Sequence, residues 1–319
     1  MQAGMAQGKT DIQWLWPILA GRAGLNPAAY RLDEGWSQRG ERPSAMIERF
    51  HSDDDAVILK IVTKPDDPLR VEALQALQAR AADVLGGTCR APRVLAHDRE
   101  AQAVLMAEAE GDRLFHLMEA ADDHRPWLTR LGAWVAAFHR ATLVEERQFK
   151  PAYNIKYIEK QLSAGKNIHQ RKAFEICSKS VLSALPAFAG QPTIAAAQHG
   201  DANLHNFIWD GGALWGIDFT NPDVAPIGYD VARALLHYAV NLADHSKLRP
   251  GEAVPRAAAE AFFEGYDLTG PNDPSIQTIL RARLVNDWVR FPASRVKQPI
   301  AQQIRFARAK AVLENIVRA

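Results

Sequence analysis

The chain has 319 residues, of which 47% are hydrophobic and 24% are charged, as in ordinary folded proteins. This composition excludes a disordered chain, a collagen-like repeat and a small disulfide scaffold. Because single cores stop growing at about 250–300 residues, the length favours two lobes. Lys and Arg number 38 and Asp and Glu 37, which leaves a net charge of +1. Charge therefore gives no reason to expect a nucleic acid or a membrane as a partner.

The cysteines and the N-terminal region indicate a cytoplasmic chain. Cys89 and Cys177 lack the spacing of a zinc site, which indicates reduced thiols. A short apolar patch at residues 14–20 follows no basic region, and Pro17 interrupts it. No run approaches the ~18 apolar residues of a membrane span, so we expect neither a secretion signal nor a transmembrane helix. The oligomeric state cannot be read from these features.

The first hundred residues predict strands and one helix. Residues 56–62 are rich in β-branched side chains and follow a turn-forming segment, which predicts a strand paired with residues 45–50. Asp67 then caps a helix that begins at Pro68. Residues 103–106 predict another strand, which leads to a break at Gly111. The stripe at helical spacing that we expect this helix to bury consists of Val71, Leu74, Leu77, Ala81 and Val84.

After Gly111 the sequence predicts mostly helices and a single hairpin. Pro126 opens the first long helix. This change of character places the boundary between a first lobe, residues 1–108, and a second lobe, residues 109–319. The further helices are expected over residues 155–165, 171–186, 229–243, 254–266, 274–291 and 300–317.

The most informative segment is residues 198–219. Two short apolar strands flank an Asp-Gly-Gly-Ala turn, which is a strong hairpin signal. With the two glycines in the loop, Trp209 faces Leu214. This register brings Asn206 and Asp218 to the same open end of the hairpin.

The residues at this open end suit phosphoryl transfer. Asn206 and Asp218 offer an amide oxygen and a carboxylate, hard ligands that Mg²⁺ accepts while it takes other oxygens from a nucleotide's phosphates. Asp201 lies on the loop that enters the hairpin. One carboxylate can orient a hydroxyl and accept its proton while the other two groups hold metal. We therefore predict that Asp201 is catalytic and that Asn206 and Asp218 are metal ligands.

Three motifs resemble those of the aminoglycoside phosphotransferase and choline kinase family of small-molecule kinases: His199-Gly-Asp with Asn206, Ile217-Asp-Phe219, and Gly228-Tyr-Asp-Val-Ala232. The resemblance implies an α+β, bilobal, protein-kinase-like fold. Its small N-terminal nucleotide-binding lobe would have an antiparallel sheet and one helix. Its larger, mainly helical C-terminal lobe would hold the catalytic and substrate sites. The implied reaction moves the γ-phosphoryl group of ATP, with Mg²⁺, onto a hydroxyl of a small metabolite.

The resemblance also implies roles for residues outside the hairpin. Lys60 would contact the α- and β-phosphates, and Glu72 would be its ion-pair partner. Asp230 would be a structural anchor, although a helix cap is as good an interpretation, and His199 would shape its loop rather than exchange protons. The connector between the lobes would offer backbone groups to adenine from Met106, Ala107 and Ala109.

Two departures from the family pattern concern the loops. No Gly-x-Gly-x-x-Gly segment is present, so residues 33–40 are the region left to cover the phosphates, with Ser37 as a contact. The family commonly reads His-Gly-Asp-Leu-His-Pro-Gly-Asn, whereas this chain has Ala-Asn-Leu-His at 202–205. Two alternatives stay open: a catalytically silent nucleotide-binding protein, and a metal-dependent phosphohydrolase built on His199, Asp201, His205 and Asp218.

The C-terminal residues 271–319 hold nine Lys or Arg and three acidic residues. A polycationic aminoglycoside needs an acid-lined pocket, because a buried amine without a carboxylate or aromatic partner is costly. The sequence therefore disfavours an aminoglycoside and leaves an amino alcohol, a sugar or a similar metabolite. We expect these basic residues to form a solvated face of the last helices rather than a dedicated anion pocket.

Overall fold

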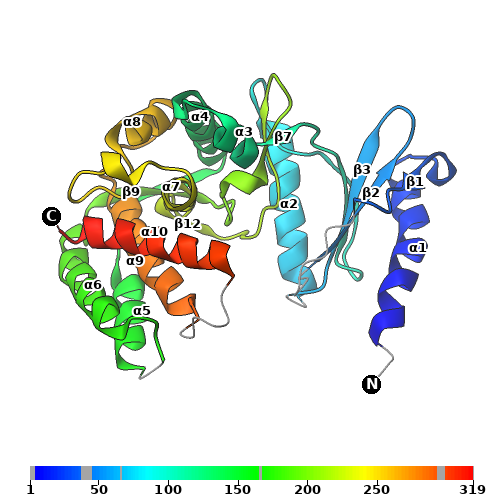
Figure 1. Cartoon of the computed structure of the whole chain (residues 1–319). Coiled ribbons are helices and arrows are strands. Elements are labelled where there is room, and N and C mark those ends of the chain that lie inside the picture. The colour runs from blue at the N-terminus through cyan, green and yellow to red at the C-terminus, as the bar shows by residue number, and fades with distance from the viewer. Residues whose placement is uncertain (1–3, 37–44, 65–66, 165–166, 293–298, 319) are drawn as a thin grey trace. The chain divides into compact units, whose positions relative to one another are not determined.

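The computed structural model describes residues 4–36, 45–64, 67–164, 167–292 and 299–318 (Figure 1). The chain divides into two compact units, Met1–Gly111 and Asp112–Ala319. The boundary expected between residues 108 and 109 lies just before this division. The α+β class and the antiparallel N-terminal sheet are confirmed. Within the described ranges, the helices fall short of the length and apolar character that a membrane crossing requires.

A five-stranded antiparallel sheet forms the centre of the first unit, in the order β1-β2-β3-β6-β5. The predicted pairing of residues 45–50 with 56–62 is confirmed, with Phe50 opposite Val57. The next strand pairs Lys60 with Val104. The strands are β1 (Arg31–Leu32), β2 (Ala45–His51), β3 (Ala56–Val62), β5 (Val94–Asp98) and β6 (Ala103–Ala107), and the short β4 spans Cys89–Arg90.

Helix α1 (Gly4–Arg22) covers one face of this sheet (Figure 1). The sequence suggested only an interrupted apolar patch here, but the helix continues through Pro17. Trp16 stacks on Phe50 at 3.9 Å between ring centroids, and Leu15 and Leu19 are buried in the same core. Burial of this face offsets the backbone hydrogen bond that an interior proline removes.

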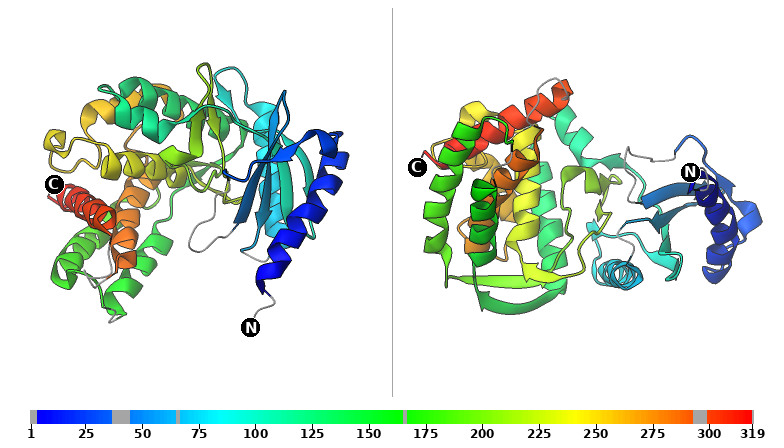
Figure 2. Two further views of the ribbon diagram at one scale, coloured as in Figure 1. Left: turned by 45° about the vertical axis from the view of Figure 1, so that its right-hand side comes forward. Right: turned by 90° about the horizontal axis from the view of Figure 1, so that it is seen from below.

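Helix α2 (Pro68–Val84) packs on the other face of the sheet, as Figure 2 shows. Its predicted cap is confirmed, since the Asp67 side chain accepts from the Arg70 amide at 3.2 Å. The buried stripe differs from the expectation at Val84, which is 47% exposed. Gln75 and Gln78 are buried in the interface instead, and each donates to a backbone carbonyl, Ala103 O and Pro92 O respectively.

The second unit is mainly helical, and the helices expected from the sequence are all present. Helices α7, α9 and α10 pack against one another, and α4 packs against α8 (Figure 1). The helices are α3 (Leu114–Ala120), α4 (Arg125–Ala141), α5 (Ala152–Ser163), α6 (Arg171–Ala184), α7 (Gly228–Asn241), α8 (Arg256–Gly265), α9 (Pro274–Arg290) and α10 (Ile300–Ile316).

The strands of this unit form more than the one hairpin that the sequence predicted. The hairpin of β10 (Phe207–Trp209) and β11 (Leu214–Gly216) is present, with β7 (Asp112–Arg113) beside β10. A separate three-stranded sheet has the order β12-β9-β8. Three successive alanines in β9 favour helix by local propensity, and strand pairing on both sides decides otherwise. These strands are β8 (Leu143–Gln148), β9 (Pro192–Ala197) and β12 (Val224–Pro226).

Candidate active site

The β10–β11 hairpin has the register that the sequence predicted. Trp209 pairs with Leu214, and the Asp210 carboxylate closes the turn by accepting from the amides of Gly212 and Ala213. At the other end, the Ile217 amide donates to the Asn206 carbonyl at 2.9 Å. Asn206 and the residue after Ile217, Asp218, therefore leave the hairpin side by side.

The chain turns sharply after β11, next to the loop that carries Asp201. Asp218 has a φ of +62°, a left-handed conformation uncommon for any residue but glycine. Two residues later, the Thr220 amide donates to the His199 carbonyl at 2.9 Å. Gly200 has a φ of +85°, and a Cβ there would lie 2.6 Å from the Cβ of Asn221. The loop of Asp201 and the segment of Asp218 thus run in direct contact.

Asp201 is ionised and held by several donors. Arg233 reaches Oδ1 with Nε at 2.7 Å and Nη2 at 2.6 Å, and Asn203 donates to Oδ2 at 2.8 Å. Burial opposes the charge on this carboxyl, but the attraction of Arg233 and the hydrogen bonds from Asn203 and Arg233 outweigh it, so the pKa is lowered. Asp201 is therefore a fixed carboxylate at neutral pH.

Asn206 is oriented by the same carboxylate. Its amide nitrogen donates to the Asp201 carbonyl at 2.9 Å and to Oδ2 at 3.2 Å. The amide oxygen is then left to act as a ligand. With the carboxylate of Asp218 it makes a hard donor pair of the type that Mg²⁺ accepts, so the residues present fit this metal.

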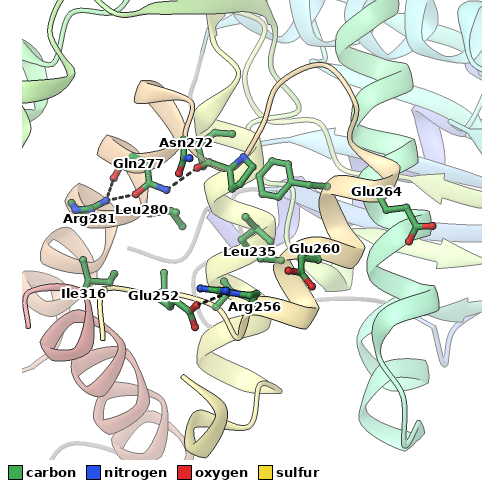
Figure 3. A pocket seen from close by; sticks show the side chains of 17 residues that line it. Leu235, Glu252, Arg256, Glu260, Glu264, Asn272, Gln277, Leu280, Arg281 and Ile316 are labelled. Carbon is green, nitrogen blue, oxygen red and sulfur yellow. Dashed lines mark hydrogen bonds and ion pairs between the residues drawn. The ribbon is translucent and has the colours of Figure 1, made fainter. Parts of the chain in front are cut away.

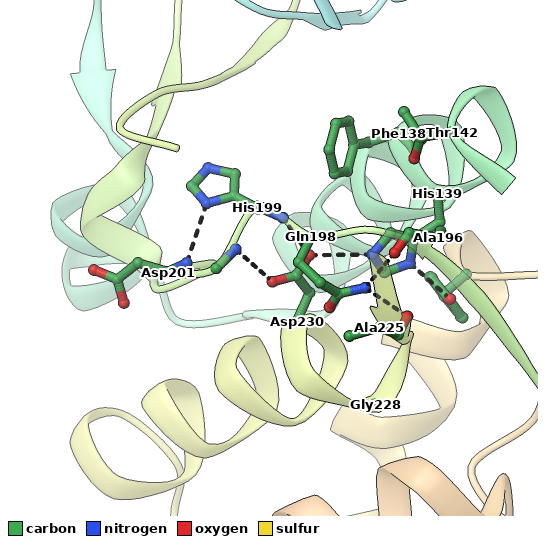
Figure 4. Close-up of polar contacts among 12 residues, drawn as sticks. Phe138, His139, Thr142, Ala196, Gln198, His199, Asp201, Ala225, Gly228 and Asp230 are labelled. Atoms are coloured by element: carbon green, nitrogen blue, oxygen red, sulfur yellow. Dashed lines mark hydrogen bonds and ion pairs between the residues drawn. The ribbon is translucent and has the colours of Figure 1, made fainter. Parts of the chain in front are cut away.

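A buried carboxylate on α7 fixes the base of the loop (Figure 4). Asp230 is 1% exposed and accepts from the backbone amides of His199 at 2.7 Å and Gly200 at 2.9 Å. It also bonds Nε2 of His139 at 3.1 Å. Helix α7 has its N-cap at Ile227 with no side-chain cap bond, so the capping interpretation of Asp230 is wrong. The structure shows the contacts of an anchor.

His199 lies in the protein interior. It is 1% exposed, and its ring stacks on Phe219 at 4.5 Å between centroids. Burial lowers its pKa despite the opposing charges of Asp230, Asp218 and Asp201, and Nδ1 accepts from the Asp201 amide at 3.4 Å. A neutral ring so placed supports the loop. The described part of the chain holds no group of three or more His, Cys, Asp or Glu side chains that could bind a metal ion.

In the first unit, Lys60 lies on the face of the sheet that α2 covers. It pairs with Val104 as Ile58 pairs with Met106, and side chains at paired positions share a face. Gln78 of α2 contacts the Met106 sulfur at 3.3 Å, which identifies that face. Lys60 is half-buried there.

The first unit also contains the other residues that the sequence predicts at the nucleotide site. Glu72 forms an ion pair with Arg99 at 3.6 Å, and its predicted pairing with Lys60 stays a prediction. The Ala107 amide is used within the unit, since it donates to Arg93 O at 2.9 Å. Met106 and Ala107 end β6, and Ala109 follows on the connector. Ser37 lies outside the described residues.

Sequence reasoning missed Arg233 and Asn203 as partners of Asp201. A signal for Arg233 exists, because it lies three residues after Asp230 on α7 and such positions share a helix face. Asn203 carries a weaker signal, as a polar side chain within the loop itself. Neither residue belongs to the motifs that carried the resemblance.

A cavity of about 690 Å³ in the second unit lies apart from this chemistry (Figure 3). Two pairs of its polar side chains contact each other: Arg256 contacts Glu252 at 3.4 Å, and Arg281 contacts Gln277 at 2.6 Å. The residues that line it do not include Asp201, Asn206 or Asp218. The cavity therefore contributes nothing to the site.

Comparisons with known proteins bear on the fold and the family of this chain. No curated protein matches the sequence. A choline/ethanolamine kinase family protein from Mesorhizobium loti has a similar structure, with a TM-score of 0.58 and 18% identity over 93% of this chain and 94% of that chain. An amicoumacin kinase in complex with AMP-PNP, Ca²⁺ and Ami has a TM-score of 0.59 and 13% identity over 98% and 96%. A glucosamine kinase in complex with glucosamine, ADP and inorganic phosphate has a TM-score of 0.56 and 16% identity over 93% and 80%.

These similarities establish an α+β, protein-kinase-like fold. At the level of sequence, residues 48–277 match the family model described as the phosphotransferase enzyme family. The match covers more than half of the chain and includes both Lys60 and the whole Asp201–Asp230 region. The chain belongs to the phosphotransferase enzyme family.

Proposed function

We propose that the protein is a kinase that transfers the γ-phosphoryl group of ATP, with Mg²⁺, to a hydroxyl group of a small molecule. The observation that carries the proposal is the contact between the loop of Asp201 and the hairpin end that carries Asn206 and Asp218. A proton acceptor and two hard ligands on adjoining segments suit phosphoryl transfer and few other reactions. The family match supports the same reaction class.

In the proposed reaction, Asp201 orients the acceptor hydroxyl and takes its proton. The acceptor oxygen forms a bond to the γ-phosphorus, the bond from that phosphorus to the β-phosphate oxygen breaks, and ADP leaves. The lowered pKa of Asp201 makes it a weak base. A weak base is sufficient because the transition state is loose and catalysis rests on positioning and electrostatics. Arg233, Asn203 and Asn206 hold the carboxylate in one orientation.

Asn206 and Asp218 would hold the metal, which when bound would neutralise charge on the phosphates. Lys60 would contact the α- and β-phosphates, and the connector with Met106, Ala107 and Ala109 would accept adenine. ATP as substrate and the two free, buried cysteines favour the cytoplasm as the location.

The test is a coupled ADP-release assay with amino alcohols, sugars and hydroxy acids as acceptors. Asp201→Asn should lower turnover by about 10²–10⁴-fold, and Asp218→Ala should abolish it. Asp223→Asn is the matched control, because Asp223 is an exposed carboxylate close to Asp218 in the chain. Full activity of the Asp218 variant would remove the metal assignment. ATP binding without phosphoryl transfer to any acceptor would show the silent nucleotide-binding protein instead.

A further inference from the structure

A basic cavity of about 290 Å³ lies among helices α7, α9 and α10 of the second unit. Four arginines from these three helices line it, Arg233, Arg283, Arg290 and Arg305. Among the described residues of its wall, Asp287 is the single acid. Arg290 and Arg305 are exposed, as expected of a solvated basic face, whereas Arg283 is partly buried; all three line the same cavity.

The arginines of this cavity outnumber the acids: Arg233 pairs with Asp201, and among the described wall residues Asp287 is the one acid for the other three. In the described part of the chain, the buried Nε of Arg283 has no hydrogen-bond partner. Burial, and next the charge of Arg233, lower the pKa of Arg283 to about 10. A buried cation that is incompletely neutralised is costly, and an anionic ligand would lower that cost.

The cavity adjoins the catalytic loop through two residues that line it. Arg233 also holds Oδ1 of Asp201 at 2.6–2.7 Å. His237 also lies 5.2 Å, ring to ring, from His205 of the same loop. Burial, then the charges of His205, Arg233 and Arg305, lower the pKa of His237 to about 3, so this ring is uncharged at neutral pH. Arg233 is thus shared between the wall of the cavity and the Asp201 loop.

Part of the remaining wall of the cavity is aromatic. Phe306 packs on Trp288 with ring centroids 5.4 Å apart and on Phe291 at 4.1 Å. Apolar walls with a few convergent charged groups are typical of small-molecule sites, and the volume is at the lower end of their range. Both the charge and the size of the cavity disfavour a polycationic antibiotic as its occupant.

We propose that the phosphoryl acceptor is an anionic alcohol, a small hydroxylated molecule whose carboxylate or phosphate group binds Arg283, Arg290 and Arg305. Its hydroxyl group would then lie at Asp201, beside Arg233. This inference rests on the proposed function and narrows its substrate class.

The test uses two sets of acceptors that share a carbon skeleton and differ in whether they carry an anionic group: glycerol, glycerate and glycerol 3-phosphate, and glucose, glucuronate and glucose 6-phosphate. Binding to the full chain is measured by calorimetry at constant ionic strength without nucleotide, and ADP release is measured separately. In at least one set, an anionic member should bind at least tenfold more tightly than the neutral one and be phosphorylated. The carboxylate and phosphate arms show which anion the cavity takes.

Arg283→Gln should weaken that binding about tenfold or more, since it removes a charged hydrogen-bond donor. Arg305→Gln serves as a second variant, because Arg305 is exposed and its substitution does not disturb the core. Arg281→Gln is the matched control, a half-buried arginine on the same helix that faces the other cavity, and it should leave binding unchanged.

Two results separate this inference from the proposed function. Phosphorylation of neutral or cationic alcohols with no gain from an anionic group, or unchanged affinity in both Arg283→Gln and Arg305→Gln, overturns the inference and leaves the kinase assignment standing. Arginine-dependent anion binding with no phosphoryl transfer to any compound overturns the kinase assignment and the acceptor role together.

Discussion

The buried carboxylate of Asp230 should be the most sensitive single position of the catalytic region. It accepts from His139 Nε2, His199 N and Gly200 N at 2.7–3.1 Å. Asp230→Ala removes all three bonds and leaves two amides buried without an acceptor. Hydrogen bonds to a charged group contribute about 1.5–3 kcal/mol each, and desolvation of the carboxylate offsets part of the sum. Removing one partner of a buried pair such as Asp230 and His139 costs about 3–5 kcal/mol. We expect Asp230→Ala to lose this much unfolding free energy.

Asp230→Asn should lose less, about 1.5–3 kcal/mol, because one amide oxygen can still accept. The size of this loss should depend on pH. Burial raises the pKa of Asp230, but His139, His199 and the Gly200 amide lower it by more, so the net shift of this pKa is downward. The stabilisation is then fully present above the unfolded pKa of about 3.9 and is lost as the pH falls through the folded value.

The assay is urea denaturation followed by circular dichroism between pH 3 and 5.5, with turnover measured on the same samples. Asp267→Asn is the control, since that carboxylate is 64% exposed in its pair with Arg140 and should change stability by less than about 1 kcal/mol. A loss in Asp230→Ala no larger than in the control would refute the anchor. So would an Asp230→Asn deficit that stays constant at acid pH.

Two further predictions concern the same loop. Arg233→Gln should raise the pKa of Asp201 and move the acid limb of the kcat/KM profile to higher pH. Arg233→Lys should keep most of the wild-type profile. An identical profile in both variants would contradict the role of the ion pair. Gly200→Ala should cost about 1–2 kcal/mol for its positive φ and about 1–3 kcal/mol more for the overlap with Asn221. Gly190→Ala, at a φ of +77° with nothing described within 4 Å of its Cβ, should show only the first cost in thermal melts, and equal losses would remove the overlap argument.

Much of the candidate site could be predicted because its decisive features are local. The turn of the β10–β11 hairpin needs only Asp210 and the residues just after it, so the sequence is enough to place Trp209 opposite Leu214. The same holds for the cap of α2 by Asp67. In each case the contacts join residues that are close in the chain, and their spacing allows few other local conformations.

Other features escaped prediction because distant segments decide them. Pro17 argues locally against a helix, yet α1 continues because its apolar face is buried on the sheet. The alanines of β9 argue locally against a strand, yet β9 pairs with β8 and β12. Here the tertiary context outweighs local propensity.

The sequence by itself predicted the type of chemistry, because Asp201, Asn206 and Asp218 lie on one loop and one hairpin whose contacts are local. Only the tertiary structure decided what surrounds them. Arg233 meets Asp201 across 32 positions of the chain, and Arg283 and Arg305 join the same cavity from two further helices. Contacts between helices depend on how whole faces pack, and a list of nine basic residues does not encode which of them will share one space.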